Sequence, residues 1–224
     1  MKLYVTPTSP YARLAMIVRL DLGLEDEIEL VWTTTRVPDD PVLTFNPSGR
    51  VPFLQLDDGS GFEDTDVIVD YLDGLAAPLR YARPDPVDVH DVDGDGNGNG
   101  NGNGNGAYWR FRRLEALARS MLDGVSVWAR EIKRPEGEQS PGLIAHERRR
   151  ADRLAHTFED EIGFAPLALA GEGLNRAQLL LFCALDVHRR LPDMDWREGC
   201  PGLSAWYDRM QEIPAVGGSL PPAD

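Results

Sequence analysis

The sequence predicts an α/β domain followed by an all-helical domain. Three observations carry this prediction. Strand and helix patterns alternate over the first 76 residues, a glycine- and asparagine-rich segment then breaks the composition, and only helical periodicity follows it. The predicted boundaries are 1–76 for the α/β domain, 77–106 for a linker and 107–224 for the helical domain.

The α/β part begins with a short apolar strand at 2–6, and Pro10 then takes the first turn of an apolar helix that ends at Gly23. Residues 27–32 alternate as a second strand. Two further short strands flank a turn at 57–59, and Asp64 or Thr65 opens the next helix. The resulting order, β-α-β-loop-β-β-α, makes a compact module.

Residues 93–106 have glycine at every second position and no apolar side chain, so this stretch buries too little surface to offset its ordering entropy. We interpret it as a linker. A weak calcium site is the alternative, because Asp91, Asp93, Asp95 and Gly96 match the first half of a calcium-binding loop. The twelfth position of that loop holds Gly102 instead of glutamate, which favours the linker.

The helical part shows apolar residues at spacings of three and four from residue 107 to 132, which predicts one long helix. A second helix is expected at 141–162. A third, buried one begins at Asn175, where Gln178 completes a variant of the capping box. A fourth, at 202–213, is stopped by Pro214.

The 224 residues carry a formal net charge of −14, which argues against a nucleic-acid partner or an anionic membrane surface. The chain has neither an apolar run of secretory length nor one long enough to span a membrane, so a cytoplasmic protein is expected. Its two cysteines give no disulfide framework or metal site. We expect Cys183 in the core and Cys200 in an exposed loop.

Ser9 stands between the first strand and the first helix, where free N–H groups and a partial positive charge favour an anion. A serine nucleophile needs a base, but the histidines lie in the linker or the helical part, and no G-x-S-x-G elbow is present. Two interpretations remain: Ser9 caps the helix, or its hydroxyl donates a hydrogen bond to a bound thiolate.

Several motifs then converge. "TPTSPYAR", "NPSGRVPFL", "DTDVIVDYLD" and "DMDWREGCPGLSAWYDRMQEIPAV" occur in the order and spacing of the cytosolic glutathione transferase superfamily, and the chain resembles its bacterial members outside the glycine/asparagine segment. The resemblance implies a thioredoxin-like N-terminal domain, a helical-bundle C-terminal domain and a glutathione site in the cleft between them.

The resemblance also implies residue roles. Pro52 would be a cis-proline at a sheet edge, and Val51 would pair its backbone with the cysteinyl part of glutathione. Asp64 and Thr65 would hold the γ-glutamyl end, and Arg50 is a candidate for the glycyl carboxylate. Ser9 would face the sulfur. Secondary candidates are Thr8 as a rival donor, Tyr11 as a packing or cleft residue, and Tyr108 and Trp109 as borders of the electrophile pocket.

The function implied is conjugation of glutathione, as co-substrate, to a small apolar electrophile, with isomerisation or dehalogenation as close variants. A serine at position 9 forms no mixed disulfide, which favours transfer over glutaredoxin-like reduction. The resemblance further implies a homodimer and a role in detoxification. The alternative is a non-catalytic interaction or regulatory protein that kept the fold.

Overall fold

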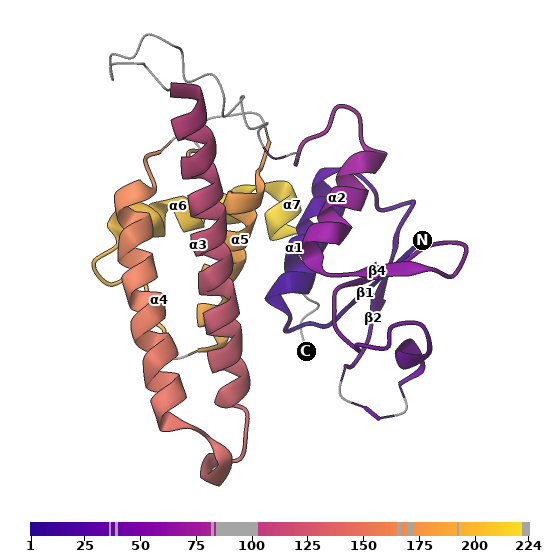
Figure 1. The fold of residues 1–224 in the computed structure, drawn as a ribbon, viewed down its shortest axis with the longest axis horizontal. Helices are drawn as coiled ribbons and strands as arrows, with labels where there is room; N and C mark the ends of the chain where they lie inside the picture. The colour runs from indigo at the N-terminus through magenta and orange to yellow at the C-terminus, as the bar shows by residue number, and fades with distance from the viewer. Residues whose placement is uncertain are drawn as a thin grey trace, which may run out of the picture.

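The computed structural model describes residues 1–35, 37–38, 40–81, 83, 103–164, 167–169, 173–191 and 193–220. A small sheet with two helices lies beside a helical bundle whose longest helices run next to each other (Figure 1). The predicted fold is confirmed: a thioredoxin-like N-terminal unit precedes an all-helical C-terminal unit. The domain boundaries stay predictions, since residues 84–102 lie outside the described ranges.

The sheet has four strands in the order β2-β1-β3-β4, namely β1 (Lys2–Val5), β2 (Glu29–Trp32), β3 (Phe53–Gln55) and β4 (Gly61–Glu63). β1 pairs in parallel with β2 and antiparallel with β3, and Leu3 lies opposite both Leu30 and Leu54. Leu3 and Leu54 are fully buried, so the apolar side chains of the inner strands form the sheet's contribution to the core.

Helix α1 (Pro10–Asp21) connects the two parallel strands, and α2 (Thr65–Leu75) packs beside it. The end of α1 is set by Gly23, whose φ of +67° suits glycine. Its N–H donates to the Leu20 carbonyl at 3.1 Å, and the Leu24 N–H donates to the Arg19 carbonyl at 2.9 Å. The predicted start and end of this helix are confirmed.

Gly61 starts β4 where the chain passes close to β3. A methyl group there would lie 2.5 Å from the Leu54 carbonyl oxygen and 2.5 Å from the Phe53 ring. Gly74, near the end of α2, has no neighbour within 4 Å of the same position. The two glycines therefore differ in whether a side chain fits.

We expect Gly61→Ala to lower the free energy of unfolding by about 1–3 kcal/mol, because the inserted methyl overpacks a strand pair. Gly74→Ala is the matched control and should leave stability unchanged or raise it by up to about 1 kcal/mol. Urea unfolding of both variants checks this. Equal free energies of unfolding for the two variants would contradict the close approach of the chain at Gly61.

The helical unit contains α3 (Asn103–Glu131), α4 (Pro141–Glu161), α5 (Arg176–Asp186), α6 (Pro201–Glu212) and α7 (Pro214–Gly217). α3 begins four residues before the expected position 107, within a glycine/asparagine run that has no apolar periodicity to reveal it. Pro214 ends α6 as predicted but also starts α7, because proline fits the first helical position.

α5 is buried along its whole length and forms the centre of the bundle. The capping box is confirmed at its start: the Gln178 N–H donates to Asn175 Oδ1 at 3.0 Å, and the Asn175 N–H donates to Gln178 Oε1 at 2.9 Å. The helix predicted to begin at Asn175 gives way after Asp186 to a 3-10 helix, η3 (Val187–Arg190). η3 brings Arg190 to the N-terminal unit.

A buried ionic cluster joins α1 to α5. Arg13 and Asp186 form an ion pair whose side chains are each 9% exposed. The Tyr207 hydroxyl donates to Asp186 Oδ1 at 2.5 Å, and Arg189 Nε lies 2.8 Å from the same oxygen. Burial favours a neutral Asp186 carboxyl, but Arg13, the Tyr207 hydroxyl and Arg189 outweigh it and hold its pKa below the usual value.

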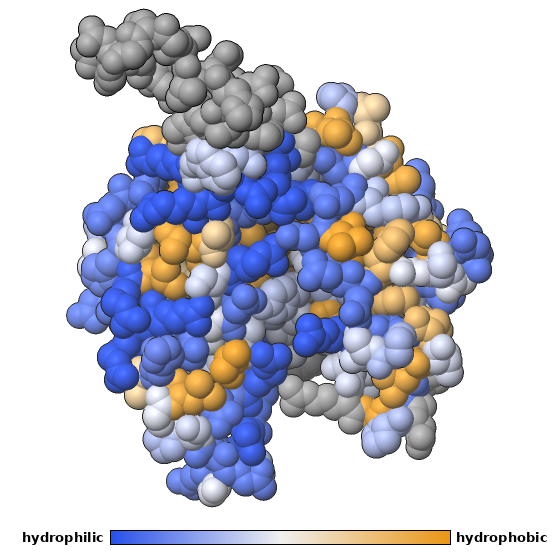
Figure 2. All heavy atoms as spheres, in the orientation of Figure 1, coloured by the Kyte–Doolittle hydropathy of each residue, from blue (hydrophilic) through white to orange (hydrophobic). Residues whose placement is uncertain are grey.

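The space-filling view shows mostly hydrophilic side chains over the visible face of α3 and α4 (Figure 2). Among the helices in the described ranges, none combines the length and the hydropathy of a membrane-spanning segment.

Candidate functional site

A cleft of about 990 Å³ separates the N-terminal unit from α3 and η3. All of the residues predicted for the glutathione site line it. They are Ser9, Arg50, Val51, Pro52, Asp64 and Thr65. Six separate stretches of chain meet at this cavity: the β1–α1 junction, the segment after β2, the loop before β3, the end of β4 with the start of α2, α3 with its end, and η3.

Ser9 caps α1. Its Oγ accepts a hydrogen bond from the Ala12 N–H at 3.1 Å, and its backbone N–H donates to the Thr6 carbonyl at 3.3 Å. Capping uses an oxygen lone pair, whereas a bound thiolate would need the hydroxyl hydrogen as donor. The two interpretations of Ser9 are therefore compatible, and its position at a helix N-terminus suits an anion.

The Val51-Pro52 peptide bond is cis and lies directly before β3. The expectation of a sheet edge is wrong, because β3 lies between β1 and β4. Pro52 avoids the ladder by preceding Phe53, the first paired residue of the strand. The backbone of Val51 therefore faces the cleft beyond the end of the ladder.

Arg50 is exposed at the cleft. Its backbone is held on both sides: its N–H donates to Ser48 Oγ at 3.1 Å, and its carbonyl accepts from Asn46 Nδ2 at 2.8 Å. Asn46 is 1% exposed. A buried amide thus fixes the loop that carries Arg50 and Val51.

Asp64 caps α2, since its Oδ1 accepts from the Asp66 N–H at 2.9 Å. Its φ of +74° lies in a region that costs a residue with a Cβ about 1–3 kcal/mol. Thr65, the first helical residue, is buried at 5% exposure. This strained junction places a carboxylate, a hydroxyl and helix N–H groups at one end of the cleft.

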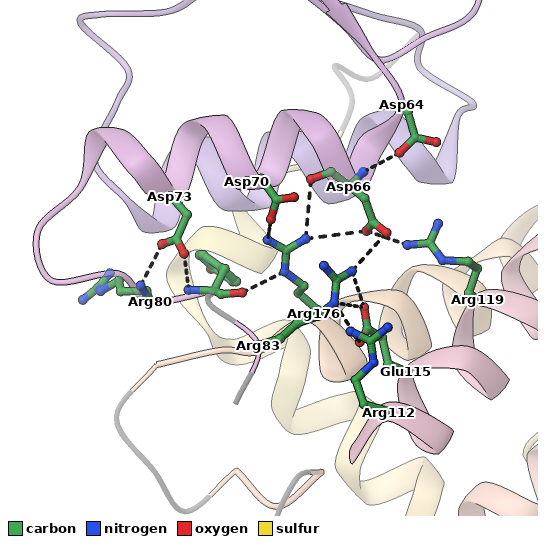
Figure 3. A network of polar contacts seen from close by, with 11 residues as sticks. Asp64, Asp66, Asp70, Asp73, Arg80, Arg83, Arg112, Glu115, Arg119 and Arg176 are labelled. Carbon is green, nitrogen blue, oxygen red and sulfur yellow. Dashed lines mark hydrogen bonds and ion pairs between the residues drawn. The ribbon is translucent and has the colours of Figure 1, made fainter. Parts of the chain in front are cut away.

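A network of arginines and carboxylates surrounds the start of α2 (Figure 3). The Asp66 carboxylate contacts Arg119 Nη2 at 2.5 Å, Arg83 Nη2 at 3.1 Å and Arg176 Nη1 at 3.6 Å. Arg176 also pairs with Asp70 and donates from Nε to the Tyr81 carbonyl at 2.7 Å. The start of α2 is thereby tied to α3 and α5.

The cleft residues of the helical unit are absent from the sequence-based prediction. They are Arg119, Asp123, Ser126, Val127, Ala129, Arg130 and Lys133 from α3 and its end, with Val187 and Arg190 from η3. Their helical spacing places them on one side of α3 but does not indicate which part of that helix meets the N-terminal unit, so no signal in the sequence identified them.

Tyr11 lines the cleft, as one of its two predicted roles requires, and its hydroxyl donates to Asp123. Burial and the Asp123 carboxylate raise the pKa of Tyr11 well above its usual value, so it is neutral at physiological pH. Tyr108 and Trp109 are not among the described residues that line the cleft; their rings contact each other, with centroids 4.9 Å apart. The expectation for these two is wrong.

Neither cysteine is exposed. Burial raises the pKa of the Cys183 thiol to about 12, in agreement with a core residue. Cys200 is also fully buried, so the expectation of an exposed loop cysteine is wrong: its side chain packs into the core at the start of α6.

The half calcium motif at Asp91 to Gly96 lies outside the described residues.

Two family models match the chain: the glutathione S-transferase N-terminal domain over residues 3–80 and its C-terminal domain over residues 123–214. An uncharacterized GST-like protein, YibF, of Escherichia coli (strain K12) is 28% identical over 205 residues, covering 90% of this chain and 86% of the relative.

Solved structures agree. A glutathione transferase family member from Pseudomonas fluorescens Pf-5, with bound S-(propanoic acid)-glutathione, is 28% identical with a TM-score of 0.75, and each chain is covered in full. A glutathione S-transferase from Methylobacillus flagellatus KT with glutathione bound is 26% identical with a TM-score of 0.77, covering 99% of each chain. The matches to both domains, in the order that the fold requires, show that this chain belongs to the glutathione S-transferase family.

Proposed function

We propose that this protein is a glutathione transferase in which the Ser9 hydroxyl stabilises the glutathione thiolate. The observation that carries the proposal is the meeting of Ser9, the Val51-Pro52 backbone and the Asp64–Thr65 helix start in one cleft. The relative from Pseudomonas fluorescens, whose structure contains a glutathione conjugate, supports the choice of ligand.

The roles follow from the chemistry of each group. The Asp64 carboxylate would hold the γ-glutamyl ammonium, and Thr65 with the first N–H groups of α2 would hold its carboxylate. The Val51 backbone would pair with the cysteinyl unit, and exposed Arg50 would hold the glycyl carboxylate. The sulfur then lies toward Ser9 at the start of α1.

The energies are sufficient. Lowering a thiol pKa by two units from about 8.5 requires about 2.7 kcal/mol of preference for the anion. A hydrogen bond to a charged group contributes about 1.5–3 kcal/mol and a helix terminus about 0.3–1 kcal/mol. In a substitution, the thiolate sulfur then bonds to the electrophilic carbon, and the leaving group departs with its electron pair.

We expect Ser9→Ala to raise the apparent pKa of bound glutathione's thiol by about 1–2 units and to lower kcat/KM by about tenfold to a hundredfold. Glutathione affinity should change little, since Ser9 touches only the sulfur. Calorimetric titration of glutathione and thiolate absorbance against pH measure both effects. A neutral-electrophile conjugation assay supplies kcat/KM.

Because Ser9 also caps α1, Ser9→Ala should cost about 1 kcal/mol of stability, which thermal unfolding measures separately. Ser9→Thr keeps both the cap and the donor and should restore the low thiol pKa. Thr8→Val is the matched control for the rival donor. If Thr8→Val raises the thiol pKa and the Ser9 variants do not, the donor is Thr8. If neither the wild type nor any variant binds glutathione at millimolar concentration, the transferase proposal fails and the non-catalytic alternative is favoured.

The proposal includes a cytoplasmic homodimer with a role in detoxification, as the family resemblance implies. Sedimentation at micromolar concentration checks the dimer, and a monomer there would contradict it.

A further inference from the structure

The wall of the cleft formed by α3 and its end is lined mainly by polar and charged side chains, with Val127 and Ala129 among them. Its lining includes Arg119, Asp123, Ser126, Arg130 and Lys133, at spacings that place these side chains along one side of the helix and its end. An apolar electrophile, as the sequence led us to expect, would bury its surface poorly against such a wall. The polar character of this wall therefore affects which class of electrophile the cleft can bind.

Two of these charges already have partners. Arg119 pairs with Asp66 at 2.5 Å, and Asp123 accepts the hydrogen bond of Tyr11. The first contact lies at the start of α2, whereas Tyr11 lies in the first turn of α1, two residues after Ser9. Neither contact uses the charged residues at the end of the wall near residue 130.

Arg130 and Lys133, at that end, make no ion pair and no hydrogen bond with any side chain in the described part of the protein. The nearby carboxylates of Glu131 and Glu138 pair with Arg134 instead, at 3.8 and 3.5 Å. Two exposed cations without an ion-pair partner among the described residues therefore border a cleft in a chain whose net charge is −14.

A neutral donor lies next to them. Ser126 is 7% exposed and lines the cleft, yet its Oγ has no hydrogen-bond partner among the described residues. It lies close to the Tyr11 hydroxyl without forming a hydrogen bond of normal geometry. A buried hydroxyl without a partner is costly unless a ligand supplies one.

A third cation approaches from η3. Arg190 lines the same cleft and donates through Nη1 to the Thr8 carbonyl, beside Ser9. Its guanidinium has further N–H groups beyond the one bound there. The positive charge of the electrophile side thus extends from α3 to the loop that carries Ser9.

We propose, building on the transferase function above, that the electrophile carries a carboxylate, which Arg130 and Lys133 bind with Ser126 as a neutral donor. Cations on the wall of a narrow cleft attract and orient an anion, while an uncharged molecule gains nothing from them. The carboxylate would then direct the reacting carbon of the electrophile toward the sulfur at Ser9.

Two glutathione derivatives of nearly the same shape test this directly: S-carboxymethylglutathione, whose S-substituent ends in a carboxylate, and S-carbamoylmethylglutathione, whose S-substituent ends in an uncharged amide. Calorimetry on the wild type should give about tenfold tighter binding of the carboxymethyl form. In the double variant Arg130→Gln/Lys133→Gln this preference should fall to about onefold to twofold. The Kd of unmodified glutathione should stay unchanged.

The control is Arg148→Gln/Arg149→Gln, which removes the same charge from exposed positions on α4 and should keep the preference. Equal binding of the two derivatives by the wild type overturns the inference. So does weaker binding of unmodified glutathione by the Arg130/Lys133 variant, since the cations would then hold glutathione itself. If none of the three ligands binds the wild type, the transferase proposal fails and the inference fails with it.

Discussion

Asp186→Asn is expected to lower the free energy of unfolding by about 3–5 kcal/mol at neutral pH. The amide keeps the shape of the carboxylate but removes its charge, which leaves the 8%-exposed Arg13 as an uncompensated buried cation. The Tyr207 hydroxyl and Arg189 lose their charged acceptor at the same time. Chemical denaturation of the variant and the wild type measures the difference.

The size of this loss depends on pH. The folded pKa of Asp186 lies below its unfolded value of about 3.9, so the stability that its charge contributes is fully present above that value. It is lost as pH falls from about 4 through the folded pKa. The stability difference between the wild type and Asp186→Asn should therefore begin to shrink below about pH 4 and disappear only below the folded pKa of Asp186.

Two further variants make the result specific. Asp208→Asn breaks an ion pair with Arg197 whose side chains are 58% and 36% exposed, and should cost less than about 1 kcal/mol. Adding Arg13→Met to Asp186→Asn removes the stranded cation and should recover much of the lost stability. If Asp186→Asn lowers the free energy of unfolding as little as Asp208→Asn does, the cluster contributes no more to stability than an exposed ion pair, and the prediction is contradicted.

Arg176→Met is expected to cost about 3 kcal/mol of stability and to weaken glutathione binding. Arg176 is 4% exposed and bonds to Asp70, to the Asp66 carboxylate and to the Tyr81 carbonyl. Without it the buried carbonyl lacks its donor, and the start of α2 loses its tie to α5. Because Asp64 and Thr65 begin that helix, we expect a raised Kd for glutathione with an unchanged thiol pKa.

Arg112→Met is the matched control. Arg112 belongs to the same network but is 37% exposed and lies 3.6 Å from Glu115, so its loss should cost at most about 0.5 kcal/mol and leave the Kd unchanged. Thermal unfolding and calorimetric titration compare the two variants. If Arg176→Met lowers stability but leaves the Kd for glutathione unchanged, the network stabilises the fold without affecting glutathione binding, which contradicts the second part of the prediction.

The sequence allowed much of the fold to be predicted because its signals are local. Pro10 fits the first helical turn because it has no N–H to leave unpaired, Gly23 adopts a positive φ, and Asn175 and Gln178 bond to each other's backbone. The structure has a helix start or end at each. The residues that we propose for the glutathione side could be named from the sequence because they lie in short contiguous motifs around Ser9, Val51 and Thr65, and the structure brings them to one cleft.

The rest depends on tertiary contacts. The burial of Cys200 is set by how α6 docks, and the position of β3 inside the sheet is set by strand pairing. Tyr108 and Trp109 suggested an aromatic pocket near the start of α3, yet the cleft is lined by the later part of this helix and by Lys133 just after its end. Which part of a long helix faces a partner domain follows from docking, which periodicity does not contain.

The cleft has a consequence for how such a protein diversifies. The side where we place glutathione comes from residues 6–65 and the opposite wall from residues 119–190, so the two sides are encoded in separate stretches of the gene. Mutations at 126, 130 or 133 alter the opposite wall and leave the loops around Ser9 and Pro52 untouched. Proteins descended from one ancestor can thus keep the binding site for the thiol co-substrate while selection changes which molecules are joined to that thiol.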